Sequence, residues 1–160
     1  MEKILVLDFG GQYNQLIARR VRDHRVFAEI LPYTTPLSVI KENGYRGIIF
    51  TGGPNSVFDP TSPHYDPAIL DIGVPILGIC YGCQLMAHTL GGHVTAAQED
   101  TAREYGKTHT FYNTSCKLFK NLPAQGITWM SHGDYMEKVP EGFSLVAHSD
   151  ACPNVAICDE

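Results

Sequence analysis

A cysteine between two glycines is the feature of this sequence that most directly suggests chemistry. An apolar run of strand length, residues 75–79, leads into Gly78-Ile79-Cys80-Tyr81-Gly82, and a helical pattern then continues to Gly91. With serine in place of cysteine, Gly-x-Cys-x-Gly is the nucleophile-elbow pattern, in which small flanking residues let a strand and a helix approach closely around one strained side chain. We therefore expect Cys80 at the tip of a strand–turn–helix.

This position favours a reactive thiol. The free N–H groups and the positive dipole end of a helix N-terminus favour an anion, and the thiolate is the reactive form of cysteine. Most unpaired cysteines are instead simply buried, and we give that interpretation to Cys116, Cys152 and Cys158.

A cysteine that attacks an acyl carbon needs hydrogen-bond donors for the oxyanion that develops. The backbone N–H of Tyr81, the residue after the nucleophile, is one candidate. Gly52 or Gly53 would supply a second, because a residue without a side chain lets the backbone approach a ligand closely. The alternative for Gly52-Gly53-Pro54 is an ordinary turn.

Two other polar patterns have weaker claims. Ser131-His132-Gly133-Asp134 invites a triad interpretation, but triads form by spatial convergence and sequence neighbours seldom face one another, so Ser131 is rejected as a nucleophile. We expect this segment either to contact a substrate or to form a polar turn.

Cys80-x-x-Cys83 also fits a redox dithiol at a helix N-terminus, although a dithiol does not require the flanking glycines. A metal site is disfavoured, because no second ligand pair accompanies these cysteines and His88 and His93 fit core or helix-end positions.

The first half of the chain alternates short apolar runs with helical patterns, which predicts a doubly wound α/β domain. Expected strands are residues 3–9, 26–31, 47–50 and 75–79, and expected helices are residues 13–24, 36–43 and 67–72. Thr35 is the expected N-cap of the second helix, with Pro36 at its first position. Ligands of such sheets bind at the carboxyl ends of the strands, where the Gly52-Gly53 loop and Cys80 would face one another.

Beyond Gly92 the pattern changes to shorter runs rich in Thr, Tyr, Val and Phe, divided by Asn, Pro and Gly. We expect strands at residues 93–96, 107–112, 126–130, 143–149 and 155–158. The predicted fold is an open, twisted, mostly parallel sheet flanked by helices, with an antiparallel extension in the C-terminal half.

Composition narrows the class of protein. With 160 residues, 44% hydrophobic and 18% charged, the chain has the size and composition of one packed domain. A formal net charge of −5 argues against nucleic acid or an anionic membrane as the main partner. Five cysteines without framework spacing, and an opening too short for a signal peptide, indicate a reducing, cytoplasmic location.

These residues resemble the class I glutamine amidotransferase family. Gly78 to Gln84 is similar to that family's active-cysteine segment. Asp8-Phe9-Gly10-Gly11-Gln12-Tyr13, Thr51-Gly52-Gly53-Pro54 and Met130-Ser131-His132-Gly133-Asp134 resemble its nucleotide-aminating branch, in the same order and across nearly the whole chain.

The resemblance implies that Cys80 attacks the side-chain amide of glutamine, that ammonia leaves, and that water hydrolyses a γ-glutamyl thioester. It places the oxyanion hole at the amides of Gly53 and Tyr81. The residues implied to line or support the glutamine pocket are Gly52, Gln84, Ser131, Gly133 and Asp134. It implies neither a metal nor a cofactor in this domain.

Two departures from the family pattern matter. Position 83 is commonly Met, and Cys83 is a compact replacement expected to pack under the elbow. The general base and its orienting acid form a His-x-Glu pair in the family, and no such pair follows Val155. Since the departing amine needs a proton and the water needs activation, residues 1–160 alone should turn glutamine over little, if at all.

We therefore expect residues 1–160 to be a C-terminally incomplete amidotransferase domain from a longer polypeptide. The resemblance implies a synthetase domain that uses ATP and Mg²⁺ to aminate a purine nucleotide, in an enzyme that is a homodimer. The alternatives are an amidotransferase for another acceptor, a redox or cysteine-hydrolase domain, and a catalytically silent glutamine-binding domain.

Overall fold

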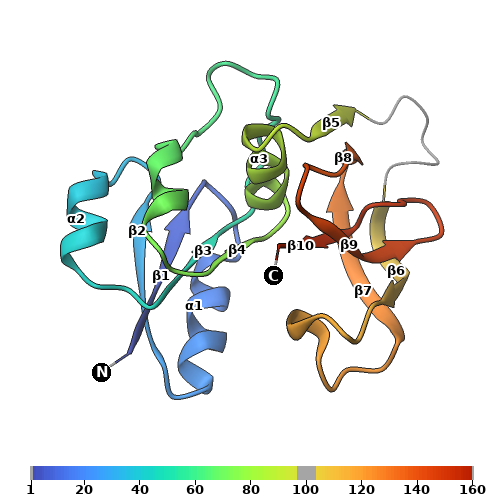
Figure 1. Ribbon diagram of the computed structural model, residues 1–160, viewed down its shortest axis with the longest axis horizontal. Coiled ribbons are helices and arrows are strands. Elements are labelled where there is room, and N and C mark those ends of the chain that lie inside the picture. The colour runs from blue at the N-terminus through green and yellow to red at the C-terminus, as the bar shows by residue number, and fades with distance from the viewer. Residues whose placement is uncertain (1, 97–103, 160) are drawn as a thin grey trace. The chain divides into compact units, whose positions relative to one another are not determined.

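The computed structural model describes residues 2–96 and 104–159, which form two compact units, Met1–Met86 and Ala87–Glu160 (Figure 1). Strands and helices alternate in the first unit. In chain order its elements are β1 (Lys3–Asp8), α1 (Asn14–Asp23), β2 (Phe27–Pro32), α2 (Leu37–Glu42), β3 (Gly47–Phe50), the 3₁₀ helix η1 (Pro67–Asp71), β4 (Ile76–Gly78) and the start of α3 (Tyr81–Thr89).

The four strands of this unit form one parallel sheet in the order β2-β1-β3-β4. The strand β2 pairs with one edge of β1, and β3 pairs with the opposite edge of β1. The carboxyl ends of β1 and β3 therefore lie at a topological switch point, where open α/β sheets bind their ligands.

Both faces of this sheet are buried, as the continuous apolar runs predict. Val6 and Ala28 pack against Ala18 of α1, and the half-buried Ile17, Val21, Ile30 and Ile49 surround them. Side chains alternate along a strand, so the buried neighbours of Val6 point to the opposite face. That face contains the buried Leu5, Leu7, Ile48 and Phe50.

Two helix predictions need correction. The helix α2 begins one residue later than expected, because Pro36 has an extended ψ of 139° and occupies the N-cap position. Thr35 does not cap this helix, since its hydroxyl donates to the carbonyl of Pro32 at 2.7 Å. Residues 67–71 form a 3₁₀ helix rather than an α-helix, begun by Asp66, whose carboxylate accepts the N–H of Ala68.

The second unit is built mainly from antiparallel strands. Its strands are β5 (His93–Ala96), β6 (Glu104–Tyr112), β7 (Gln125–His132), β8 (Asp134–Lys138), β9 (Ser144–Ser149) and β10 (Ala156–Cys158), with the 3₁₀ helix η3 (Lys117–Phe119) between β6 and β7. One sheet has the order β10-β9-β6-β7, and β5 pairs with β8 in a second. The predicted antiparallel extension is confirmed.

The strands around the His132 segment are longer than predicted. The strand β6 begins at Glu104, β7 continues to His132, and β8 follows at Asp134 after a single residue. The strand β8 was not predicted, because residues 131–138 are largely polar and lack the alternation of apolar residues that marks a strand.

The helices of the described segments are short. The longest α-helix, α1, has 10 residues, whereas a membrane span requires about 20. Within residues 2–96 and 104–159, no helix has the length and apolarity needed to cross a membrane.

Candidate active site

Cys80 lies at a sharp turn between a strand and a helix. The strand β4 ends at Gly78 and α3 begins at Tyr81, so two residues make the connection. Cys80 has φ of 53°, a left-handed conformation that is strained for a residue with a side chain, and it is exposed. The predicted elbow geometry is confirmed.

The glycines on either side of Cys80 allow the strand and helix to approach. A Cβ atom on Gly78 would lie 2.8 Å from the backbone of Cys83, and one on Gly82 would lie 2.6 Å from the carbonyl oxygen of Phe50. The Gly82 N–H also donates to the Thr51 carbonyl at 3.1 Å. The helix N-terminus is thereby held directly against the end of β3.

The loop after β3 adjoins Cys80. A Cβ atom on Gly52 would lie 3.3 Å from the Cβ and 3.9 Å from the Sγ of Cys80. One on Gly53 would lie 2.6 Å from the Phe9 carbonyl oxygen. The predicted proximity of the Gly52-Gly53 loop to the cysteine is therefore confirmed. A larger residue at position 53 would displace backbone, and one at position 52 would crowd the Cys80 side chain.

Tyr81 places a backbone donor beside the sulfur. Its N–H donates to the Cys80 thiol group. Its side chain is fully buried, its hydroxyl donates to the Pro63 carbonyl at 2.6 Å, and its ring lies 6.0 Å from that of Phe9. A residue held at its ring and hydroxyl keeps its amide in a fixed direction, as an oxyanion donor requires.

Thr51 is a supporting residue that the sequence did not reveal. It is fully buried, and its hydroxyl accepts the Phe9 N–H at 3.0 Å while its own N–H donates to the Leu7 carbonyl at 3.2 Å. With its carbonyl bonded to Gly82, Thr51 joins β1, β3 and α3 at the switch point. Its position in Thr-Gly-Gly-Pro is the only signal in the sequence, and that signal indicates a turn as readily.

The predicted ease of forming a Cys80 thiolate needs correction. Although the residue is exposed, protein atoms surround part of its sulfur, and the resulting desolvation raises the pKa of Cys80, while the hydrogen bond from the Tyr81 amide only partly opposes this. Desolvation disfavours the charged form of a thiol, and here it outweighs the local donor. A nearby base that takes the thiol proton would therefore assist attack by Cys80.

This direction predicts the pH dependence of Cys80 alkylation. A raised pKa keeps the thiol protonated at neutral pH, so the rate of reaction with iodoacetamide should keep increasing through the alkaline range, beyond the midpoint of an ordinary cysteine. The measurement is the alkylation rate of Cys80 against pH, followed by peptide mass spectrometry. A rate that is already constant at pH 7 would contradict the assignment.

Cys83 and Gln84 occupy the first turn of α3. Burial, and then the charge of Cys80, raise the pKa of Cys83 to about 11. This agrees with the packing role expected for Cys83. The N–H of Gln84 donates to the Cys80 carbonyl at 3.0 Å, which begins the helix, and its side chain is half-buried.

The remaining predicted residues belong to the second unit. Ser131 is exposed near the end of β7, Gly133 is the single residue between β7 and β8, and Asp134 begins β8. Cys116 and Cys152 are buried as predicted, and burial raises the pKa of Cys152, whereas Cys158 is only half-buried. The structure brings together Cys80, Gly52, Gly53 and Tyr81 in one unit and forms the Ser131–Asp134 turn in the other.

The sequence matches the glutamine amidotransferase class-I family over residues 5–160. The chain belongs to this family. It is 54% identical over 156 residues to the GMP synthase [glutamine-hydrolyzing] of Clostridium botulinum, and 58% identical over 151 residues to that of Caldicellulosiruptor saccharolyticus. These alignments cover 98% and 94% of this chain but only 30% and 29% of the relatives, so the chain spans less than a third of their length.

Solved structures of amidotransferases share the fold. A Thermoplasma acidophilum protein, described as one subunit of a GMP synthase, superposes with a TM-score of 0.81 at 28% identity, covering 100% of this chain and 79% of its own. A glutamine amidotransferase from Thermotoga maritima, 19% identical, has a TM-score of 0.74 and covers 98% of this chain and 71% of its own. The predicted fold class is confirmed.

Proposed function

We propose that this chain is the glutamine-hydrolysing part of a GMP synthase, with Cys80 as its nucleophile. The observation that carries the proposal is the strained, exposed Cys80 at a strand–helix elbow, with the Tyr81 amide directed at its sulfur. The identity to GMP synthases over nearly the whole chain supports the choice of reaction.

The reaction begins when a base removes the thiol proton and the sulfur attacks the side-chain carbonyl carbon of glutamine. The C–N bond then breaks, the amine leaves with an added proton as ammonia, and a γ-glutamyl thioester remains on Cys80. Water, deprotonated by the base, attacks the thioester to give glutamate and the free thiol. The raised pKa of Cys80 is consistent with this need for a base.

The negative oxygen formed at each addition needs fixed donors. We assign this role to the amides of Tyr81 and Gly53, and assign glutamine binding to Gly52, Gln84, Ser131, Gly133 and Asp134. The base and its acid partner are assigned to a His-x-Glu segment outside the 160 residues, because the relatives are more than three times as long.

The whole enzyme would pass the ammonia to a synthetase domain in the same polypeptide. That domain would use ATP and Mg²⁺ to aminate XMP to GMP, and the enzyme would be a homodimer in the cytoplasm. An amidotransferase for another acceptor remains the alternative, and the sequence of the adjoining domain distinguishes the two.

A diazoketone analogue of glutamine tests the assignment of the nucleophile. In a polypeptide extended to the length of the curated relatives, it should alkylate Cys80 and leave the other four cysteines unmodified, and free glutamine should protect Cys80. Peptide mass spectrometry reads the modified residue. Modification of a different cysteine, or reaction that glutamine does not slow, would overturn the proposal.

A redox function makes a different prediction for the same residues. The five cysteines, all within the described residues, are thiols, and burial raises the pKa of Cys83 to about 11. Because the proposed function gives Cys83 no part in the chemistry, equilibration with a glutathione redox series should give no Cys80–Cys83 disulfide with a defined potential. A reversible disulfide with a defined potential would favour the redox alternative.

A further inference from the structure

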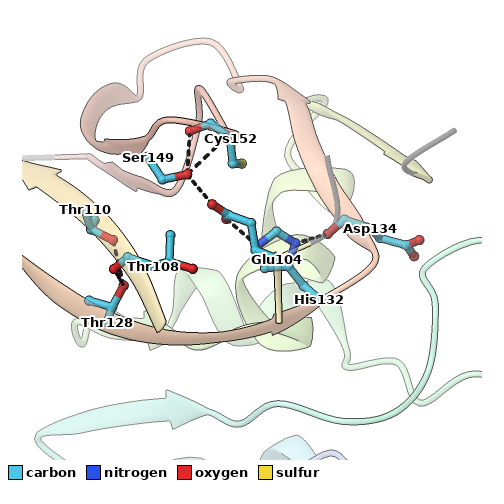
Figure 2. A network of polar contacts seen from close by, with 8 residues as sticks. All are labelled: Glu104, Thr108, Thr110, Thr128, His132, Asp134, Ser149 and Cys152. Carbon is cyan, nitrogen blue, oxygen red and sulfur yellow. Dashed lines mark hydrogen bonds and ion pairs between the residues drawn. The ribbon is translucent and has the colours of Figure 1, made fainter. Parts of the chain in front are cut away.

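A buried carboxylate in the second unit holds the turn between β7 and β8. Glu104 is 5% exposed, and both of its carboxylate oxygens have partners (Figure 2). One oxygen lies 2.9 Å from Nε2 of His132, the residue opposite Glu104 on the neighbouring strand. The other accepts the hydroxyl proton of Ser149.

Ser149 is itself fixed in direction. Its Oγ accepts the N–H of Cys152 at 3.0 Å, so its own proton is available for Glu104. Because the hydroxyl is buried and receives a backbone donor, the carboxylate behind His132 is held in one position.

The second nitrogen of His132 reaches across the turn. Nδ1 lies 3.0 Å from the backbone carbonyl of Asp134, and since a carbonyl only accepts, Nδ1 carries a proton (Figure 2). One further proton is shared between Nε2 and Glu104. With both ring nitrogens occupied, His132 is not available as a general base without losing one of these bonds.

Through its hydrogen bond to Asp134, the ring of His132 therefore links the end of β7 to the start of β8, and only Gly133 lies between these two strands. The residues of this turn are Ser131, Gly133 and Asp134, to which the proposed function assigns glutamine binding. A turn of this kind sets the positions of its backbone groups, and small displacements of binding groups have large effects on reaction rates.

We propose that Glu104 is a positioning residue for glutamine, acting through His132 on the Ser131–Asp134 turn. The inference rests on the proposed function, because it concerns how the assigned glutamine-binding turn is shaped. It adds Glu104, His132 and Ser149 to the residues on which glutamine recognition depends.

Two substitutions at position 104 separate positioning from charge. Leucine in Glu104→Leu has similar bulk and removes both hydrogen bonds. In Glu104→Gln the amide NH₂ group can donate to Nε2 and the amide oxygen can accept from Ser149, so both bonds survive without the charge. Glu137→Leu is the matched control, since Glu137 pairs with His93 at 3.4 Å on the exposed surface.

The readout compares two reagents on Cys80 in a polypeptide of the relatives' length. The diazoketone analogue requires the glutamine pocket, whereas iodoacetamide requires only the thiol. We expect Glu104→Leu to slow diazoketone labelling about tenfold or more, because the turn shifts, and to leave iodoacetamide labelling unchanged. Glu104→Gln should recover most of the lost rate, and Glu137→Leu should match the wild type.

Glu104→Leu could fail to fold, so His132→Gln serves as a second variant that keeps a hydrogen-bond partner for the buried Glu104 carboxylate. The amide of His132→Gln reaches the position of Nε2 but does not bind the Asp134 carbonyl, so it should also slow the diazoketone selectively. Wild-type rates in Glu104→Leu or His132→Gln would overturn the inference, as would equal slowing of both reagents. Failure of the proposed function is distinct, since wild-type Cys80 would then show no preference for the diazoketone.

Discussion

We expect replacement of Cys80 by alanine, in a polypeptide of the relatives' length, to abolish glutamine-dependent GMP synthesis and to leave ammonia-dependent synthesis intact. This is the largest effect that the proposed function predicts. Without the sulfur no thioester forms, and loss of a nucleophile of this kind lowers kcat by about four orders of magnitude or more. Ammonia added to the solution bypasses the hydrolysis step. The measurement is GMP formation by a polypeptide extended to the length of the curated relatives, with glutamine or with ammonium as the nitrogen source.

The matched control is Cys83→Ala, three residues after Cys80 in the first turn of α3. Cys83 is half-buried with a raised pKa and no proposed part in the chemistry, so glutamine-dependent synthesis should remain. Loss of synthesis with both nitrogen sources in Cys80→Ala would indicate a folding defect instead. Retention of glutamine-dependent synthesis would contradict the assignment of Cys80.

The elbow could be predicted from sequence because its constraints are local. Gly78 and Gly82 must lack side chains because backbone atoms lie too close to them, and they belong to a strand, a turn and a helix that follow one another directly in the sequence. The mostly parallel α/β sheet could be predicted for a similar reason, since right-handed crossovers leave few arrangements for alternating strands and helices. In the first unit the differences are in element ends, as at Thr35 and Pro36, and in the 3₁₀ helix at residues 67–71.

Glu104 could not be found in this way. Its partners His132 and Ser149 lie 28 and 45 residues away in the sequence, and nothing local marks a glutamate at a strand end as buried. The strand β8 was missed because its sequence, Asp134–Lys138, is largely polar. The direction of the Cys80 pKa also depended on packing around the sulfur, which the Gly-x-Cys-x-Gly pattern does not report.

Gly82→Ala should unfold the elbow, which is the largest expected effect on stability. The added methyl group would lie 2.6 Å from the carbonyl oxygen and 2.8 Å from the carbonyl carbon of Phe50, so α3 must move away from β3. That movement also strains the hydrogen bond from the Gly82 N–H to Thr51. Overpacking of this kind costs about 3 kcal/mol, which corresponds to a fall in Tm of about 10 °C for a chain of this size.

The control is Gly126→Ala on β7, where the nearest atom to the new methyl group is the Tyr112 hydroxyl at an ordinary contact distance of 3.5 Å. Thermal unfolding followed by circular dichroism gives Tm, and iodoacetamide gives the exposure of Cys80 in the folded state. Because Thr51 connects this helix to the ends of β1 and β3, we expect Gly82→Ala to alter Cys80 alkylation well below its Tm. Equal Tm values for the two variants would mean that α3 and β3 are not held by the close approach at Gly82.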